Sequence, residues 1–254
     1  MKKISLKQIV TILATIALVV LNILANALPF NGLNTGEISD RFDILFVPAG
    51  YVFSIWLLIY IGLIAYTVFQ ALPSQRDNPL LNKLAWPYWI SVDANIIWLV
   101  LWHWEVFSLT LVAMAALLVS LLVIYLRIRN IGRDLTAQER WLVRLPFSVY
   151  LGWVSVATVA NATQVLYFYG WNGFGIAPEV WAAIMIAVAT ILGLLMLARE
   201  RDLGYAAVLV WAFIGIANKQ AGVPMVMAAS WAGAVMLAVA GLAVFIKDRK
   251  KREV

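Results

Sequence analysis

The stretch from Leu145 to Leu166 reads LPFSVYLGWVSVATVANATQVL and contains no charged residue. A helix needs roughly 20 residues to cross a hydrocarbon core of about 30 Å, and this stretch meets that length. Arg144 stands directly before it, where a basic residue commonly marks the membrane boundary. The stretch therefore predicts a transmembrane helix.

Seven other apolar stretches are also near this length: residues 8–28, 49–72, 84–102, 106–126, 180–198, 203–219 and 223–246. The whole chain is 64% hydrophobic and only 13% charged, outside the usual range of soluble domains. We therefore predict an all-α polytopic membrane bundle with eight transmembrane helices.

Basic residues are distributed unequally between the two sides of these helices. Of 19 Lys and Arg residues, all except Arg41 and Lys219 fall on the side that carries both termini. The positive-inside rule makes that side cytoplasmic. We expect an integral protein of a bacterial-type inner (plasma) membrane with both termini cytoplasmic. The net charge of +6 sits in short loops, which predicts contact with lipid headgroups and no nucleic-acid partner.

The first apolar stretch ends in Ala25-Asn26-Ala27, which resembles a signal peptidase site. Cleavage there leaves seven spans and an unchanged C-terminal side, so charge bias does not decide between the two outcomes. We favour a retained helix because the apolar run is longer than most signal cores. The chain has no cysteine and one histidine, which predicts no built-in metal or cofactor.

Aromatic and amide side chains recur at helical spacing within the apolar stretches. Three stripes result: Phe53, Trp56 and Tyr60; Asn95, Trp98 and Trp102; and Tyr150, Trp153, Ala157 and Asn161. Twelve tryptophans are more than interfacial anchoring requires. Two interpretations remain open: packing between helices, and a binding site for a planar apolar ligand.

Asp93 lies midway along the third apolar stretch, where a carboxyl group is costly. Such a residue pairs with another helix or faces a cavity, and the sequence leaves both roles open. We include Asp93 among the expected ligand-binding residues. The alternative function is a proton-coupled secondary transporter of a small solute in which Asp93 carries the proton.

Three motifs resemble those of the TspO/translocator-protein family of tryptophan-rich sensory proteins. They are PAGYVFSIWLLIY at residues 48–60, NIIW at residues 95–98 and PFSVYLGWVSVATVAN at residues 146–161. The resemblance implies a five-helix core over residues 1–170, which leaves residues 171–254 as a three-helix extension. It also implies a homodimer and a pocket for porphyrins or other tetrapyrroles, including haem.

By the same resemblance, Trp56 and Trp153 face the pocket, and Asn95 and Asn161 supply its amides. We expect Phe53, Tyr60, Trp98 and Tyr150 to line its walls. Some family members are associated with light-dependent porphyrin breakdown, but we expect sensing or transport without catalysis. The chain departs from the family pattern because no tryptophan lies between Pro29 and Val47. The extension is expected to cap the bundle, replace the dimer contact or form a second pocket around Trp211 and Trp231.

Overall fold

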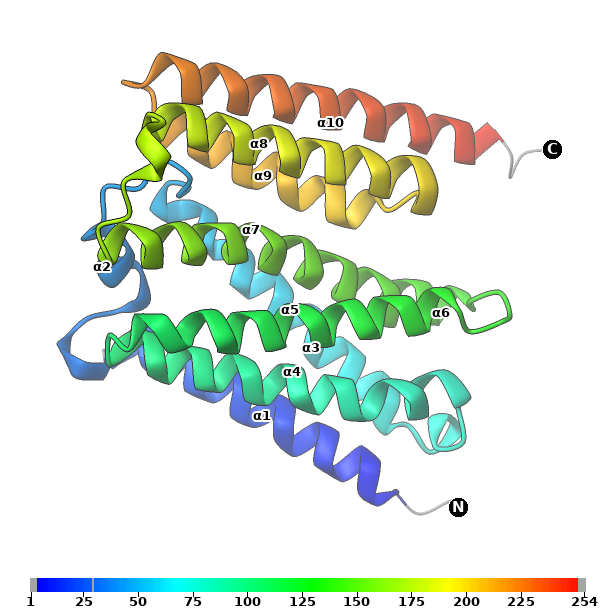
Figure 1. Ribbon diagram of the computed structural model, residues 1–254. Coiled ribbons are helices and arrows are strands. Elements are labelled where there is room, and N and C mark those ends of the chain that lie inside the picture. Colours follow the sequence, from blue (N-terminus) through cyan, green and yellow to red (C-terminus); the bar gives the residue numbers. More distant parts are fainter. Residues whose placement is uncertain (1–3, 29, 251–254) are drawn as a thin grey trace. The chain divides into compact units, whose positions relative to one another are not determined.

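The computed structural model describes residues 4–28 and 30–250. Within these residues the secondary structure is helical (Figure 1). The main helices are α1 (Leu6–Ala27), α2 (Thr35–Asp40), α3 (Ile55–Ala71), α4 (Pro79–His103), α5 (Phe107–Arg129), α6 (Ala137–Glu139), α7 (Leu145–Phe168), α8 (Pro178–Leu195), α9 (Leu203–Lys219) and α10 (Pro224–Lys250).

The predicted all-α membrane bundle is confirmed. Among the described residues, seven helices are long and apolar enough to cross a membrane. The eighth predicted stretch also forms an apolar helix, α9, but its 17 residues extend only about 26 Å. The chain is therefore a polytopic helical protein with seven full-length candidate spans and one shorter apolar helix.

The chain forms two compact units. Unit 1 comprises Met1–Arg41 and Trp56–Val154, and unit 2 comprises Phe42–Ile55 and Ser155–Val254. The chain passes from one unit to the other three times: after Arg41, at the start of α3 and within α7. The division of the chain into residues 1–170 and 171–254 stays a prediction.

In unit 1, α1 places polar side chains inward and apolar side chains outward. Gln8, Thr11, Thr15 and Asn22 are buried and follow one another at steps of three, four and seven residues, which places them on one face of the helix. The exposed positions between them include Leu13, Ile16 and Val20. This arrangement suits a lipid environment, because apolar side chains face the acyl chains and polar groups find partners in the protein.

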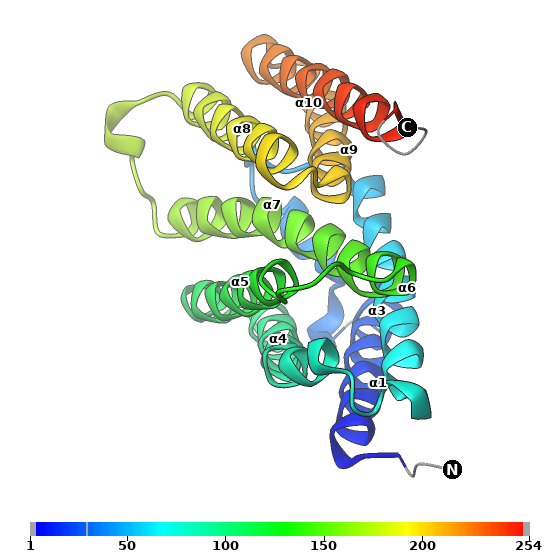
Figure 2. The same cartoon turned by 90° about the vertical axis from the view of Figure 1, so that its right-hand side faces the viewer.

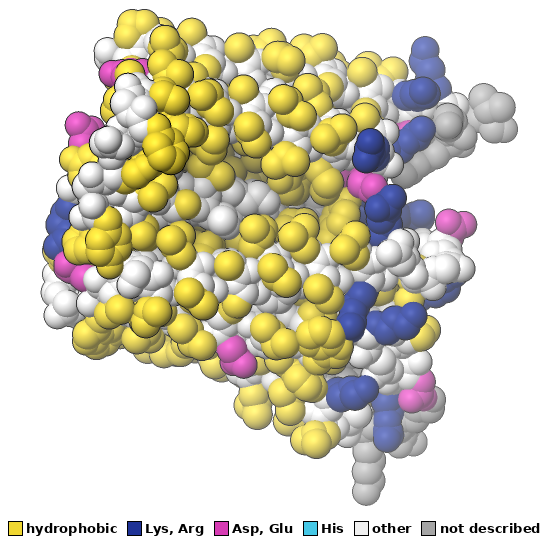
Figure 3. Space-filling view, in the orientation of Figure 1, with side chains coloured by type: hydrophobic (Ala, Val, Ile, Leu, Met, Phe, Trp, Pro, Cys, Tyr) yellow, Lys and Arg dark blue, Asp and Glu magenta, His cyan; other side chains and the backbone are white. Residues whose placement is uncertain are grey.

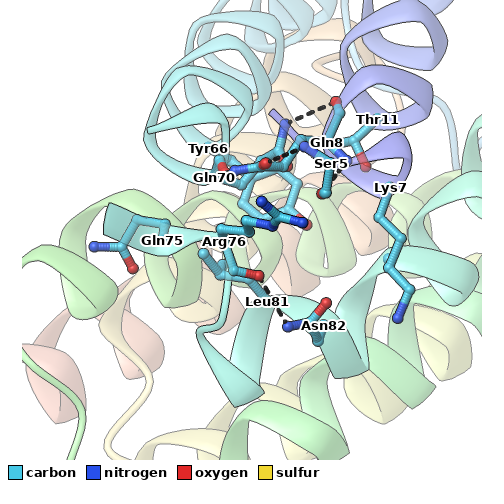
Figure 4. Close-up of a pocket in the computed structure, with 11 residues that line it drawn as sticks. Ser5, Lys7, Gln8, Thr11, Tyr66, Gln70, Gln75, Arg76, Leu81 and Asn82 are labelled. Atoms are coloured by element: carbon cyan, nitrogen blue, oxygen red, sulfur yellow. Dashed lines mark hydrogen bonds between the residues drawn. The ribbon is translucent and has the colours of Figure 1, made fainter. Parts of the chain in front are cut away.

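At one end of α1, Gln8 binds the end of α3 (Figure 4). The Gln8 side-chain amide donates to the Gln70 carbonyl at 2.7 Å, and the Gln70 amide donates back to the Gln8 carbonyl at 3.3 Å. A cavity of about 10 Å³ beside this pair has room for about one water molecule. The two reciprocal bonds join α1 to α3.

Further along α1, Thr15 links three helices. Its hydroxyl lies 2.7 Å from the Thr67 hydroxyl of α3 and 2.6 Å from the Tyr88 hydroxyl of α4. One turn earlier, the Trp89 indole of α4 donates to the Thr11 hydroxyl at 3.0 Å. Side-chain hydrogen bonds thus run along the length of α1.

An aromatic core fills unit 1 between α3, α4 and α7. Tyr66, Tyr88 and Phe147 are fully buried and meet edge-to-face with ring centroids 4.9–5.8 Å apart. Beside them α3 approaches α7 closely, because a Cβ placed on Gly62 lies only 3.0 Å from the Pro146 Cβ. Gly62 therefore sets the separation of the two helices that carry the aromatic stripes.

The segment that contains Thr35 and Arg41 packs on the turn between α4 and α5 within unit 1. The Trp102 indole donates to the Thr35 carbonyl at 3.2 Å, and Arg41 pairs with Glu105 at 2.9 Å. At the opposite end of α4, Glu139 accepts from Asn78 at 3.0 Å and from both terminal nitrogens of Arg133. Polar contacts therefore secure both ends of unit 1.

In unit 2, α8, α9 and α10 pack together (Figures 1 and 2). Leu209, Phe213 and Ile216 of α9 are fully buried. Asp202 caps the start of α9 by accepting from the Tyr205 backbone N–H at 3.0 Å, and Arg201 pairs with Asp248 of α10. The short helix α9 is thus the most enclosed element of the extension.

Replacing Thr15 with valine tests the hydrogen bonds of α1. The variant leaves the buried Tyr88 hydroxyl without its Thr15 partner, so we expect a loss of about 1–2 kcal/mol in the free energy of unfolding. Thermal unfolding in detergent measures this loss in stability. Thr163→Val is the control, because the Thr163 hydroxyl bonds the Val159 carbonyl of its own helix. Equal stability of the two variants contradicts the role of Thr15.

Candidate ligand site

Four aromatic side chains of α3 and α7 gather in unit 1: Trp56, Tyr60, Tyr150 and Trp153. We name them the aromatic cluster. Trp56 stacks on Tyr60 with ring centroids 5.6 Å apart and an interplanar angle of 22°. The Trp56 ring meets Tyr150 edge-on at 5.9 Å and Trp153 edge-on at 6.4 Å. The structure thus brings together two residues from each of two predicted stripes.

Helix geometry explains the convergence. Trp56 and Tyr60 are four residues apart on α3, and Tyr150 and Trp153 are three apart on α7, so each pair occupies one face of its helix. The close approach at Gly62 brings the two faces within ring-contact distance. The cluster therefore depends on spacing within each helix and on the absence of a side chain at Gly62.

The aromatic cluster has a buried side and an accessible side. Tyr150 and Trp153 are 1% and 2% exposed, whereas Trp56 and Tyr60 are half-buried. A planar molecule arriving from the bilayer therefore meets Trp56 and Tyr60 first. Ring faces suit an apolar planar molecule, and the tyrosine hydroxyls supply polar handles.

Asn95 fixes the orientation of Tyr150. The Asn95 amide nitrogen donates to the Tyr150 hydroxyl at 3.1 Å, and the Asn95 carbonyl oxygen accepts from the Asn22 amide at 2.9 Å. Asn95 is 1% exposed. Both ends of this predicted ligand-binding amide therefore bind protein groups, and Asn95 acts on the cluster through Tyr150.

The other predicted residues of α4 are Asp93 and Trp98. Asp93 is exposed, and two residues of helix turn it by about 200° from the buried Asn95, so it faces away from Tyr150. Trp98 stacks on Trp102 with ring centroids 5.0 Å apart, near the end of α4. The remaining predicted residues, Phe53 and Asn161, belong to unit 2, where Phe53 is half-buried and Asn161 is 3% exposed.

Within unit 2, α9 holds the segment that leads into α3, residues 48–54. The Ala49 backbone N–H donates to the Gly215 carbonyl at 3.1 Å, and the Trp211 indole donates to the Val52 carbonyl at 3.1 Å. The Asn218 amide donates to the Tyr51 hydroxyl at 2.8 Å. The extension thus supports one of the three motifs quoted from the sequence.

Gly215 makes this attachment possible. A Cβ placed on Gly215 lies 2.2 Å from Val52 Cγ2 and 3.0 Å from Pro48 Cβ, so any side chain there displaces residues 48–54. Trp211 also meets Tyr51 edge-on at 5.5 Å. Trp211 therefore serves as an attachment point for this segment.

Sequence reasoning did not identify Asn22, Thr15, Gly62 or Gly215 as important. A signal was present for the first two, because the polar residues Gln8, Thr11, Thr15 and Asn22 recur at steps of three, four and seven within an apolar stretch. The two glycines carried no such signal, since their role depends on which helix packs against them. Among the described residues, no group of three His, Asp or Glu side chains is placed to hold a metal ion.

The chain belongs to the TSPO-like protein family, whose match covers residues 8–243. The match includes α8, α9 and α10 as far as residue 243, together with the helices that carry the aromatic cluster. No curated protein and no solved structure matches the chain. The predicted family is therefore confirmed.

A double-mutant cycle tests the Asn95–Tyr150 hydrogen bond. We expect Asn95→Leu and Tyr150→Phe to be non-additive by about 0.6–1.7 kcal/mol in the free energy of unfolding, measured by thermal unfolding in detergent. Asn95→Leu with Ser120→Ala is the control cycle, because Ser120 bonds the Ala116 carbonyl of its own helix. Additive effects in both cycles exclude the coupling.

Gly215→Ala tests the attachment of residues 48–54 to α9. Overpacking against Val52 should cost about 1–3 kcal/mol in the free energy of unfolding. Gly222→Ala is the matched control, because no atom lies within 4 Å of a Cβ at that position. An unchanged melting temperature for Gly215→Ala contradicts the close packing.

Proposed function

We propose that this TSPO-like membrane protein binds a planar hydrophobic molecule, a porphyrin or related tetrapyrrole, at the aromatic cluster. The single observation that carries the proposal is the edge-on meeting of Trp56 and Trp153 from two different helices. Family membership supports the ligand class. The proposed role is sensing or transport in the inner membrane, with both termini on the cytoplasmic side.

Binding must rearrange the aromatic cluster, because its rings already contact one another. Each ring pair contributes about 0.5–1.5 kcal/mol, which the ligand regains by stacking on the same rings. Trp56 and Tyr60 are half-buried and stand on one helix face, so they are the pair that can turn aside. The buried Tyr150 and Trp153 then form the fixed wall against which the ligand rests.

Tyr150 supplies the polar contact in this proposal. Its hydroxyl accepts from Asn95, so its own proton can be donated to a ring nitrogen or a propionate of the ligand. Asn95 is a positioning residue, since both ends of its amide bind protein groups. For Phe53 and Asn161, which belong to unit 2, ligand binding stays a prediction. Asp93 lies on the opposite face of α4 from Asn95.

Removing the two indoles tests the proposal. We expect Trp56→Leu combined with Trp153→Leu to raise the Kd for protoporphyrin IX about tenfold, because two stacking partners are lost. Titration of the porphyrin Soret absorbance against protein in nanodiscs measures the Kd without relying on tryptophan emission. The control is Trp141→Leu combined with Trp231→Leu, since both of these indoles are exposed.

Asp93→Leu adds a second comparison. This variant should bind protoporphyrin IX with unchanged Kd if the aromatic cluster is the site, because Asp93 faces away from it. Absence of saturable binding to the unaltered protein, or an equal loss in both double variants, refutes the proposal.

A further inference from the structure

A surface hollow of about 220 Å³ lies at one end of the α4–α5 pair in unit 1. Its lining residues are Lys83, Val123, Leu126, Arg127 and Asn130. Lys83 stands in the first turns of α4, and Arg127 stands in the last turn of α5, so the two cations come from antiparallel neighbours. Over α4 and α5, Lys and Arg side chains gather at one end and apolar side chains cover the middle (Figure 3).

The Arg127 guanidinium is held in place by α4. One of its terminal nitrogens donates to the Lys83 carbonyl, and its carbon lies 4.4 Å from the centre of the Trp86 ring. A guanidinium restrained by an aromatic face and a carbonyl loses less entropy when it binds an anion. Its remaining N–H groups are available to a ligand.

Two further donors of the hollow have no partner among the described residues. The Lys83 ammonium and the Asn130 side-chain amide make no hydrogen bond or ion pair there, and both residues are exposed. The lining contains no Asp or Glu. The hollow therefore offers positive charge and hydrogen-bond donors without a neutralising carboxylate.

The apolar lining indicates what kind of anion fits. Val123 and Leu126 lie on α5 before Arg127, toward the middle of the helix, and Leu126 is 46% exposed. Trp86 is 47% exposed at the same level of α4 as Arg127, where amphipathic rings meet lipid headgroups. A basic head region thus continues into an apolar wall along the helix pair.

We propose that this hollow binds the phosphate headgroup of an anionic phospholipid, with an acyl chain along Val123 and Leu126. Basic pockets between transmembrane helices are suited to such headgroups. Arg127 and Lys83 contact the phosphate, Asn130 donates to a headgroup oxygen, and Trp86 keeps the guanidinium in place. The site is independent of the aromatic cluster and of the tetrapyrrole proposal.

Native mass spectrometry of the delipidated protein tests the proposal with phosphatidylglycerol, phosphatidylcholine and inorganic phosphate as separate probes. We expect one phosphatidylglycerol to bind in preference to phosphatidylcholine. The Lys83→Gln, Arg127→Gln double variant should bind it about tenfold more weakly. The control is Lys7→Gln with Arg140→Gln, which removes the same charges from exposed positions outside the hollow.

Lys83→Gln alone is a second test, because it leaves both contacts of the Arg127 guanidinium in place, and it should lower the affinity by a smaller factor. Three results with the double variant, the control and the probes overturn the proposal. These are equal binding of both lipids, an equal loss in the control variant, and displacement of the lipid by millimolar inorganic phosphate. Unchanged phosphatidylglycerol binding in the folded Lys83→Gln variant also overturns it.

Discussion

The chain of hydrogen bonds from Asn22 through Asn95 to Tyr150 is the interaction on which the proposed site depends. In hydrocarbon a buried amide or hydroxyl must find its partner within the protein, because water is absent. The Asn22 side-chain amide of α1 donates a hydrogen bond to the side-chain carbonyl oxygen of Asn95. This bond orients the Asn95 side chain so that its amide nitrogen points toward Tyr150 of α7. Helix α1 therefore orients the aromatic cluster although it contributes no ring to it.

The aromatic cluster and the attachment of residues 48–54 share one feature. Small or polar residues set the distances between helices, and large aromatic rings fill the space between them. Gly62 lets α3 approach α7, and Gly215 lets residues 48–54 lie on α9. The first approach places Trp56 of α3 in contact with Trp153 of α7, and the second places Trp211 of α9 in contact with Val52. The extension of the TSPO-like chain thus has a structural task, which is to hold the segment that enters α3.

The sequence predicted the helices well because apolar length is a local property, and all eight predicted stretches are helical. It also predicted the faces that carry Trp56, Tyr60, Tyr150 and Trp153, since helical spacing fixes a face. Spacing does not identify the partner of a face, so the pairing of Asn95 with Asn22 and of Trp211 with Val52 was not predicted. Asp93 and Asn95 are both predicted to bind the ligand for different reasons, and positions two residues apart point in opposite directions on a helix.

An experimental structure of the protein loaded with protoporphyrin IX in a lipid nanodisc tests the central claim most directly. The account predicts the porphyrin plane against the indoles of Trp56 and Trp153, with the Asn22–Asn95–Tyr150 hydrogen bonds retained. A porphyrin bound elsewhere while Trp56 and Trp153 remain in contact contradicts it.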